Sequence, residues 1–305
     1  MAEIFGYGDK DQDKLTYFVV ALVSVICVVF VNYFEVLNIL DSTIIAVESS
    51  IVPGIILTIF RTGATILAFY TIFVLMIFDE NGGYMNPLFR KERESLPHKT
   101  IGIERMVPFS SWNLIVCGLC FLSMSVLGWY EFFEIGAPKL LTMLSGILLP
   151  MALGMGMLTS TVVTYVIVPQ ETRSDRNYDH LFEPHEMVMH NWAIILLAID
   201  LFISRPNLSW ELAIFGLIIG IIYSIFAYMY AVFGGGYYVY TFIDPRIKYS
   251  PMIMTILALA ISLFYIFIWM ISKLIEYNQW VGGIALLICV YTVILFKQPK
   301  RIHSS

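Results

Sequence analysis

Ser110, Glu186 and His190 are residue types that could together carry out acyl transfer. A nucleophilic hydroxyl needs a base within hydrogen-bond reach, and usually a group that orients the base. Glu186 precedes His190 by four residues, so a helix reaching back that far would place both side chains on one face. Ser110 is then the candidate nucleophile, His190 the candidate general base, and Glu186 or Asn191 the orienting or polarising group.

The same residues also have a purely structural interpretation, which the spacing alone favours. Ser110 suits the N-cap position of the apolar segment that follows it, and Ser111 competes with it for the role of nucleophile. His190 could form hydrogen bonds between helices. Ionisable groups at bilayer depth cost about 2.5–3.5 kcal/mol each on insertion scales, which makes them functional candidates by default.

Asp200 is the other costly group in this region of the sequence. It could form a structural ion pair with Arg61 or with Arg205. A role in proton transfer is less favoured, because no series of acidic residues leads to it.

A glycine run and several hydroxyl-bearing side chains are candidates for contacts with a substrate. Gly235 and Gly236 could let the backbone approach a ligand, although glycine more often ends a helix. Tyr237 and Tyr240 resemble an interfacial aromatic belt, and Thr161 could instead bond back to its own helix.

The composition is that of a polytopic α-helical membrane protein. The chain has 305 residues, of which 59% are hydrophobic and 13% charged, with a mean hydropathy of +0.79. Repeated apolar runs near twenty residues match the thickness of a bilayer. The net charge of −5 argues against nucleic acid as a partner, which leaves membrane lipids as the expected partners.

No metal or organic cofactor is expected. The spacing from His185 to His190 differs from that of the zinc-binding HExxH helix. All four cysteines fall inside predicted spans, where packing is their expected role.

The hydropathy pattern predicts one all-α transmembrane domain over residues 1–305, with a cytosolic connector at 79–107. The first span follows an acidic leader without a small-residue cleavage site, so we expect it to be retained. Eight transmembrane helices are predicted, at residues 15–36, 51–78, 110–129, 140–168, 189–203, 210–233, 252–272 and 280–296.

The distribution of basic residues predicts the orientation. Of the 18 Lys and Arg residues, only Lys139, Arg205 and Lys273 fall in the predicted outer segments, and Arg61 lies within a span. The positive-inside rule then places both termini in the cytosol. Ser110, His190 and the glycine run converge at the cytosolic leaflet. The endoplasmic reticulum and the plasma membrane are both compatible with these features.

Several short motifs resemble the androgen-induced membrane hydrolase family and its rolling-stone relatives. They are Phe-Ser-Ser-Trp-Asn-Leu at 109–114, Met-His at 189–190 with an acid at Asp200, and Gly-Tyr-Tyr-Val-Tyr-Thr-Phe-Ile-Asp at 236–244. Ile-Phe-Arg at 59–61 followed by Ala-Phe-Tyr at 68–70 resembles the first span of that family. The resemblance covers about residues 57–272, a six-helix core with one additional helix at each end.

The resemblance implies an intramembrane threonine-type hydrolase of fatty acid esters of hydroxy fatty acids. By position, the family threonine falls at Ser110 and the family histidine at His190. Serine can perform the same chemistry as threonine, but the difference weakens strict equivalence. Rolling-stone members are linked to cell fusion instead, so the shared fold does not fix the function.

The sequence thus favours an intramembrane lipid-ester hydrolase. One alternative is a non-catalytic membrane component in which the polar groups only pack helices. A transporter ranks third, because there is no convincing internal repeat and the polar groups gather at one leaflet rather than at the midplane.

Overall fold

The computed structural model describes residues 6–42, 49, 51–173 and 179–297. The predicted fold class is confirmed: within these residues, seven helices are long and apolar enough to cross a membrane. These helical segments are Asp13–Tyr33, Gly54–Ile77, Phe109–Phe132, Lys139–Thr172, Pro184–Ser204, Trp210–Phe233 and Ser250–Tyr277. Residues 1–5 and 298–305 lie outside the described part, so the cytosolic placement of the termini stays a prediction.

The eighth predicted span, 280–296, forms a shorter helix. Helix α11 covers Gln279–Val293, 15 residues. At 1.5 Å per residue it extends about 22 Å, less than the roughly 30 Å of a hydrocarbon core. The main chain becomes extended at Ile294, so the helix does not continue. The side chain of Asn191 forms hydrogen bonds with the main chain of Leu295. The described chain therefore has seven helices of spanning length and one short apolar helix.

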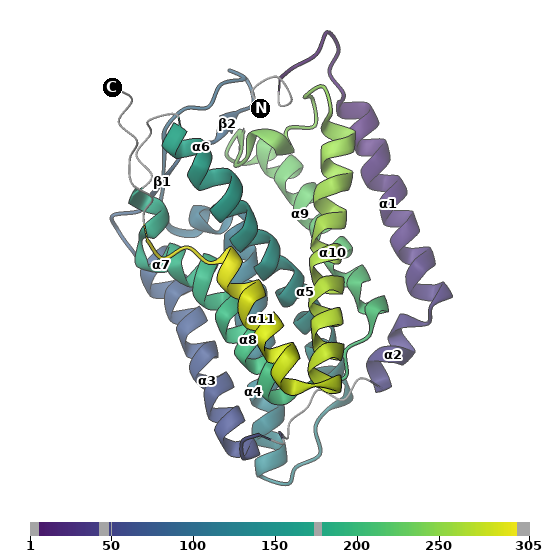
Figure 1. Cartoon of the computed structure of the whole chain (residues 1–305). Coiled ribbons are helices and arrows are strands. Elements are labelled where there is room, and N and C mark those ends of the chain that lie inside the picture. The colour runs from purple at the N-terminus through teal and green to yellow at the C-terminus, as the bar shows by residue number, and fades with distance from the viewer. Residues whose placement is uncertain (1–5, 43–48, 50, 174–178, 298–305) are drawn as a thin grey trace.

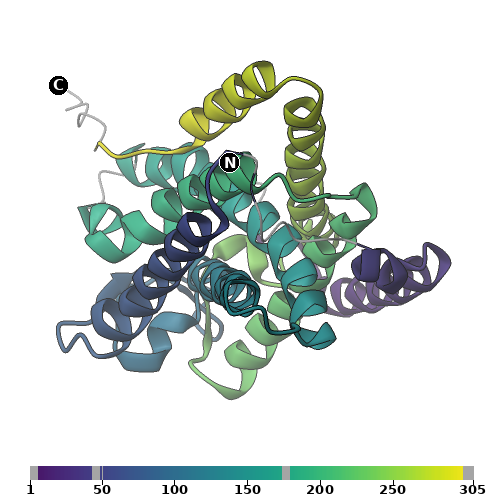
Figure 2. The same ribbon diagram turned by 90° about the horizontal axis from the view of Figure 1, so that it is seen from below.

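Helix α5 (Lys139–Val162) runs through the middle of the bundle, and nearly all its side chains from Leu148 to Ser160 are buried. Around it lie α4 (Phe109–Phe132), α8 (Ala193–Ser204), α9 (Ile214–Phe233) and α10 (Ser250–Tyr277). Figure 2, which views the bundle from one end, shows α1 (Asp13–Tyr33) and α2 (Val36–Ser42) at its edge. Helix α3 (Gly54–Tyr70) packs on α4 at the opposite edge (Figure 1).

Among the described residues, three membrane helices contain a π-helical turn. These turns are η1 (Thr71–Ile77) after α3, η3 (Val163–Ile167) after α5, and η5 (Val188–Trp192) before α8. A π-helical turn contains one residue more than an α-helical turn. The extra residue shifts the helical hydrogen-bond pattern and leaves carbonyl groups available to other partners. Short helices adjoin them at the same end: α6 (Val168–Arg173), η4 (Asp179–Phe182) and α7 (Pro184–Met187).

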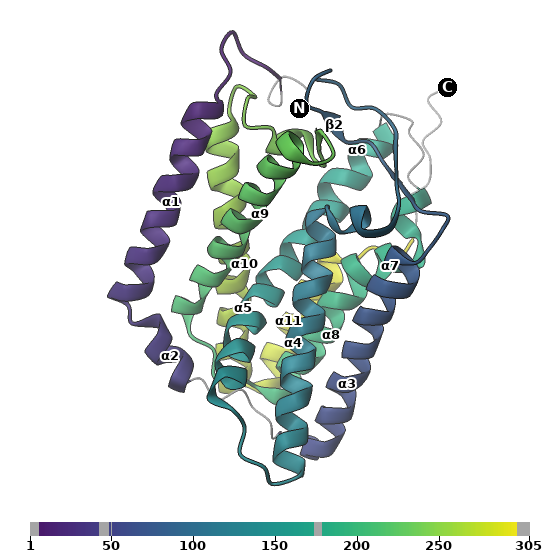
Figure 3. The same ribbon diagram turned by 180° about the vertical axis from the view of Figure 1, so that it is seen from behind.

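The predicted cytosolic connector is folded against the end of the bundle (Figure 3). Strand β1 (Gly83–Met85) pairs antiparallel with β3 (His98–Thr100), and β2 (Leu88–Phe89) pairs with β4 (Tyr237–Tyr238) beyond α9. The 3₁₀ helix η2 (Gly102–Met106) then leads into α4. The connector thus covers the entry to α4, where Ser110 lies. The 3₁₀ turn η6 (Trp210–Ala213) precedes α9, and the 3₁₀ turn η7 (Thr241–Ile243) follows β4.

Candidate functional site

His190 lies in the π-helical turn η5 and is buried. Two neighbouring helices bind consecutive carbonyls of this turn. The Nδ2 amide of Asn113 in α4 donates to the carbonyl of Met189 at 3.2 Å. The hydroxyl of Ser160 in α5 donates to the carbonyl of His190. The position of His190 is therefore fixed by contacts from both α4 and α5.

Glu186 contacts two imidazoles. Its Oε2 lies 3.3 Å from Nδ1 of His190, one helical turn away, as the sequence spacing predicts. Its Oε1 lies 3.4 Å from Nε2 of His185. Nδ1 of His190 is buried and has no hydrogen-bond partner among the described residues, so Glu186 acts on it through its charge.

His185 is held by the buried guanidinium of Arg105. Nη2 of Arg105 lies 2.8 Å from Nε2 of His185. Because a guanidinium only donates, Nε2 of His185 is the acceptor in this hydrogen bond. Nη1 of Arg105 donates to the carbonyls of Leu75 and Met76 and to Asp79. Arg105 thus ties the connector to the end of η1 and to α7.

Ser110 is the second residue of α4 and is 8% exposed. It lies on the wall of a cavity of about 60 Å³ beneath the connector. Glu186, His185, Arg105 and Ser111 are on the same wall. Ser110 and Glu186, which the sequence assigns to one site, therefore share a cavity.

Tyr240 faces Ser110 from the segment after β4. Burial raises the pKa of the Tyr240 hydroxyl to about 12, although hydrogen bonds with the side chain and main chain of Ser110 and with the main chain of Phe109 act in the opposite direction. The negative charge of Glu186 also favours the protonated phenol. The Tyr240 hydroxyl is therefore protonated at neutral pH and is not a base.

Ser110 and His190 do not touch directly. No hydrogen bond between them occurs in the part of the chain that the structure describes, and His190 is not among the residues on the cavity wall. Glu186 lies on this wall and also contacts His190.

Two of the supporting residues make structural contacts. Asn191 donates from Nδ2 to the carbonyl of Leu295 and accepts from its N–H through Oδ1, both at 3.0 Å. The Ser111 hydroxyl donates to the carbonyl of Arg105 at 2.7 Å. Neither side chain contacts His190.

Asp200 forms a buried ion pair with Arg61, the first of the two partners that the sequence offers. Nε of Arg61 lies 2.7 Å from Oδ1 of Asp200, and both side chains are 1% exposed. Ser204 donates a further hydrogen bond to this carboxylate. Arg205 donates to Gln279 instead. Asp200 therefore joins α3 to α8.

The predicted substrate contacts, Tyr240 included, are not among the residues that line the Ser110 cavity. Gly236 has a φ of +77° and accepts a hydrogen bond from the N–H of Arg90 through its carbonyl, which directs the chain into β4. Gly235 lies in the same turn, directly after Gly234, which ends α9. Thr161 lies in α5 with its hydroxyl buried.

Tyr237 belongs to a separate cluster centred on Glu104. The Tyr237 hydroxyl donates to Oε1 of Glu104 at 2.8 Å, and Nε2 of His98 lies 2.8 Å from the same oxygen. Tyr230 is the third group facing this carboxylate, at 3.4 Å. The cluster fastens the connector to the end of α9.

Sequence reasoning missed Arg105, His185 and Asn113. Asn113 could have been singled out from the sequence, because it is a polar amide inside a predicted membrane span. Nothing in the sequence distinguished Arg105, because it is one of several cations in a segment expected to be solvated. His185 adjoins Glu186, but its link to Arg105 depends on the fold of the connector.

In the described ranges, no group of three or more His, Cys, Asp or Glu side chains is arranged to hold a metal ion. The four cysteines are buried and unpaired. Comparison with models of known protein families gives no match, and neither curated protein sequences nor solved structures give one.

Proposed function

We propose that this protein is an intramembrane hydrolase of lipid esters, with Ser110 as nucleophile and His190 as general base. The observation that carries the proposal is the position of Glu186, which lies on the wall of the Ser110 cavity and 3.3 Å from His190. The resemblance to the androgen-induced hydrolases supports the same pair of residues. His185 is a poorer base, because Arg105 occupies its acceptor nitrogen.

In the first step, the Ser110 oxygen bonds to the ester carbonyl carbon while its proton passes to the imidazole of His190. Collapse of the tetrahedral intermediate breaks the bond to the alkoxide, which takes the proton from the imidazolium. Water then attacks the acyl-serine with His190 as base, and the carboxylic acid leaves as Ser110 regains its proton. The balance is one ester and one water giving one acid and one alcohol.

This reaction requires the His190 ring to come within hydrogen-bond reach of Ser110. Catalytic hydrogen bonds are often long in the ligand-free state and shorten when substrate binds. The location of His190 in a π-helical turn supports the proposal, since π-helical turns are frequent at functional sites. Glu186 would stabilise the imidazolium by its charge.

The substrate in this proposal is a lipid with an acyl ester, such as a fatty acid ester of a hydroxy fatty acid, that enters from the cytosolic leaflet. The cavity lies at the end of the bundle that the predicted orientation assigns to the cytosolic side. Membrane lipids are the partners, and the reaction uses no metal or organic cofactor.

A second candidate is a non-catalytic membrane component, and a specific set of contacts favours it. Asn191, Ser111 and Asp200 each bond to a structural partner. Polar side chains that join helices in this way stabilise membrane bundles without chemistry.

Purified protein in lipid nanodiscs tests the proposal with hydroxy-fatty-acid esters as substrates. We expect Ser110→Ala and His190→Ala to abolish turnover, and Glu186→Gln to lower kcat. Ser123→Ala is the matched control, because this buried serine of α4 donates only to its own helix. Equal turnover by wild type, Ser110→Ala and His190→Ala would eliminate this site, and absence of turnover in correctly folded wild type would favour the non-catalytic component.

A further inference from the structure

Strands β1 and β3 of the connector form a two-stranded strap over the Ser110 cavity. All three residues of β1, Gly83–Met85, line this cavity, and so does Thr100 of β3. Ser110 lies on the same wall. A ligand that approaches Ser110 from the side of the connector must therefore pass the strap.

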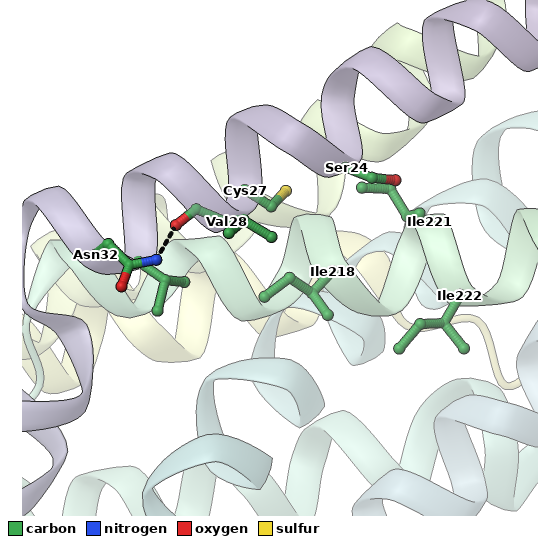
Figure 4. A pocket seen from close by; sticks show the side chains of 8 residues that line it. Ser24, Cys27, Val28, Asn32, Ile218, Ile221 and Ile222 are labelled. Carbon is green, nitrogen blue, oxygen red and sulfur yellow. Dashed lines mark hydrogen bonds between the residues drawn. The ribbon is translucent and has the colours of Figure 1, made fainter.

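The cavity beneath the strap is too small for a lipid ester. Its volume is about 60 Å³. By comparison, a cavity of about 150 Å³ holds benzene, and sites for small molecules measure about 300–1,000 Å³. A larger hollow of about 330 Å³ between α1 and α9 adds no room, because it shares no wall residue with the Ser110 cavity (Figure 4). A substrate of the proposed reaction therefore reaches Ser110 only if part of the wall moves.

The base of the strap is fixed by Arg105. Nη1 of Arg105 donates to Asp79 before β1 and to the carbonyl of Met76 in η1, and its side chain is 3% exposed. Gly82 and Gly102 lie between this base and the two strands, with φ of +68° and +62°. Glycine enters and leaves the left-handed region without a Cβ penalty. The strap can therefore turn at these two positions while its base stays in place.

The strap adds no side chain to the apolar core. Within the described residues, no member of the hydrophobic core belongs to β1 or β3, and Tyr84 of β1 is 64% exposed. Strand β2 differs, since its Leu88 is 6% exposed and packs in the core. Segments with few buried apolar contacts open at the lowest free energy. The strap, rather than β2, is therefore the movable part of the connector.

A polar latch of His98, Glu104 and Tyr237 holds β3 beside β4. Nε2 of His98 and the Tyr237 hydroxyl each lie 2.8 Å from Oε1 of Glu104. The rings of His98 and Tyr237 are also in contact, with centroids 5.1 Å apart. The side chains of His98 and Glu104 are 29% and 26% exposed, so water can compete for these bonds. The latch can thus open without loss of core packing.

We propose that the strap of β1 and β3 is a gate, which swings away from Ser110 when the latch opens and then admits the acyl ester of a membrane lipid. Arg105 keeps the base in place, and the strap turns at Gly82 and Gly102. The lipid ester as the ligand rests on the proposed function, whereas the opening of the cavity does not.

Maleimide labelling of Ser110→Cys measures the opening of this gate without reference to catalysis. The full-length protein in lipid nanodiscs is exposed to N-ethylmaleimide, and the peptide that contains position 110 is quantified over time by mass spectrometry. Tyr237→Phe removes the latch hydroxyl but keeps the ring, and should raise the labelling rate several-fold. Tyr238→Phe is the matched control, because both tyrosines are 1% exposed in β4 and, of the two, only Tyr237 donates to Glu104 in the described structure.

A second pair of variants protects the test against misfolding of one protein. Glu104→Gln removes the charge of the latch and should raise the labelling rate about tenfold, since hydrogen bonds to charged groups are the stronger ones. Glu94→Gln is its control, because Glu94 is an exposed residue of the same connector outside the latch. Cys117 and Cys120 of α4, which are 2% and 0% exposed, report on unfolding and should stay unlabelled throughout.

Equal labelling of position 110 in the latch and control variants would overturn the gate and make the strap a permanent cover. Labelling of Cys117 and Cys120 together with position 110 would equally overturn it, because the whole bundle would then have loosened. Ester hydrolysis is measured separately in variants that retain Ser110. If labelling responds to the latch but no protein hydrolyses the ester, the gate stands and the proposed function fails.

Discussion

Asn191 and Leu295 exchange two hydrogen bonds of 3.0 Å, one from the amide of the side chain and one from the N–H of the main chain. The asparagine side chain thereby takes the place of a neighbouring strand for the segment after α11. Because Asn191 follows His190 directly in η5, this contact also joins the end of the described chain to the turn that carries the candidate base.

Asn191→Ala should release the segment at 294–297 while the bundle stays folded. Removing the side chain leaves the N–H and carbonyl of Leu295 without the Asn191 partner; because Leu295 is only partly buried, the cost is below the roughly 1–3 kcal/mol of a fully buried group. Hydrogen exchange of the Leu295 amide is expected to accelerate. Asn32→Ala is the control, because Asn32 bonds only to its own helix. Unchanged exchange at Leu295 would contradict this role of Asn191.

Asp200→Ala should strongly destabilise the protein. The Arg61–Asp200 pair is 1% exposed on both sides, and breaking a buried pair costs about 3–5 kcal/mol because one charge remains unpaired. The double variant Arg61→Met with Asp200→Met should recover much of that loss, since no unpaired charge is left. Thermal unfolding in detergent measures both. A double variant no more stable than Asp200→Ala would show that the unpaired charge is not the cause.

Asn113→Ala should impair catalysis more than substrate binding. Without the Asn113 amide, the Met189 carbonyl loses its partner and η5 can shift the ring of His190. A misplacement near 1 Å can cost on the order of 10²-fold in rate. We expect a lower kcat for lipid-ester hydrolysis with little change in KM, and Ser160→Ala should act in the same direction. An increase in KM alone would argue that Asn113 contacts the substrate instead.

Gly128→Ala should loosen the α3–α4 contact. A Cβ at Gly128 would overlap the Thr58 hydroxyl, and overpacking of this kind costs about 1–3 kcal/mol. Gly63→Ala is the control, because a Cβ there meets no atom within 4 Å. The melting temperature should fall for Gly128→Ala and hold or rise for Gly63→Ala. The reverse order would exclude close packing at Gly128.

The connector should detach from the bundle in acid. Burial favours the neutral form of Glu104, but hydrogen bonds from His98, Tyr237 and Tyr230 outweigh it and leave the pKa of Glu104 below its ordinary 4.5. A carboxyl with a lowered pKa stabilises the folded state fully above its unfolded pKa, and that stability is lost as the pH falls through the folded pKa. Hydrogen exchange at 98–104 should therefore accelerate below about pH 4.5. Glu104→Gln should remove this pH dependence, and an unchanged acid response in that variant would refute the role of Glu104.

The membrane fold follows from the sequence because it depends on local composition. Apolar runs of spanning length form helices in a bilayer whatever their neighbours, since no other arrangement satisfies their backbone groups. The exception is 280–296, where composition predicts a span but a contact with the distant Asn191 accompanies the end of the helix at Val293. Helix length there depends on tertiary structure.

The pairing of Glu186 with His190 was also accessible from the sequence, because residues four apart share a helix face. The choice of partners across helices was not. The sequence could not choose between Arg61 and Arg205 for Asp200, nor assign Asn191 to Leu295, because these partners are 139 and 104 residues apart along the chain. The folding of the connector over Ser110 depends on Arg105 reaching η1 and α7, and on Glu104 reaching α9. Local periodicity determines which residues face the same side of a helix, whereas the partners across helices are selected only when the bundle packs.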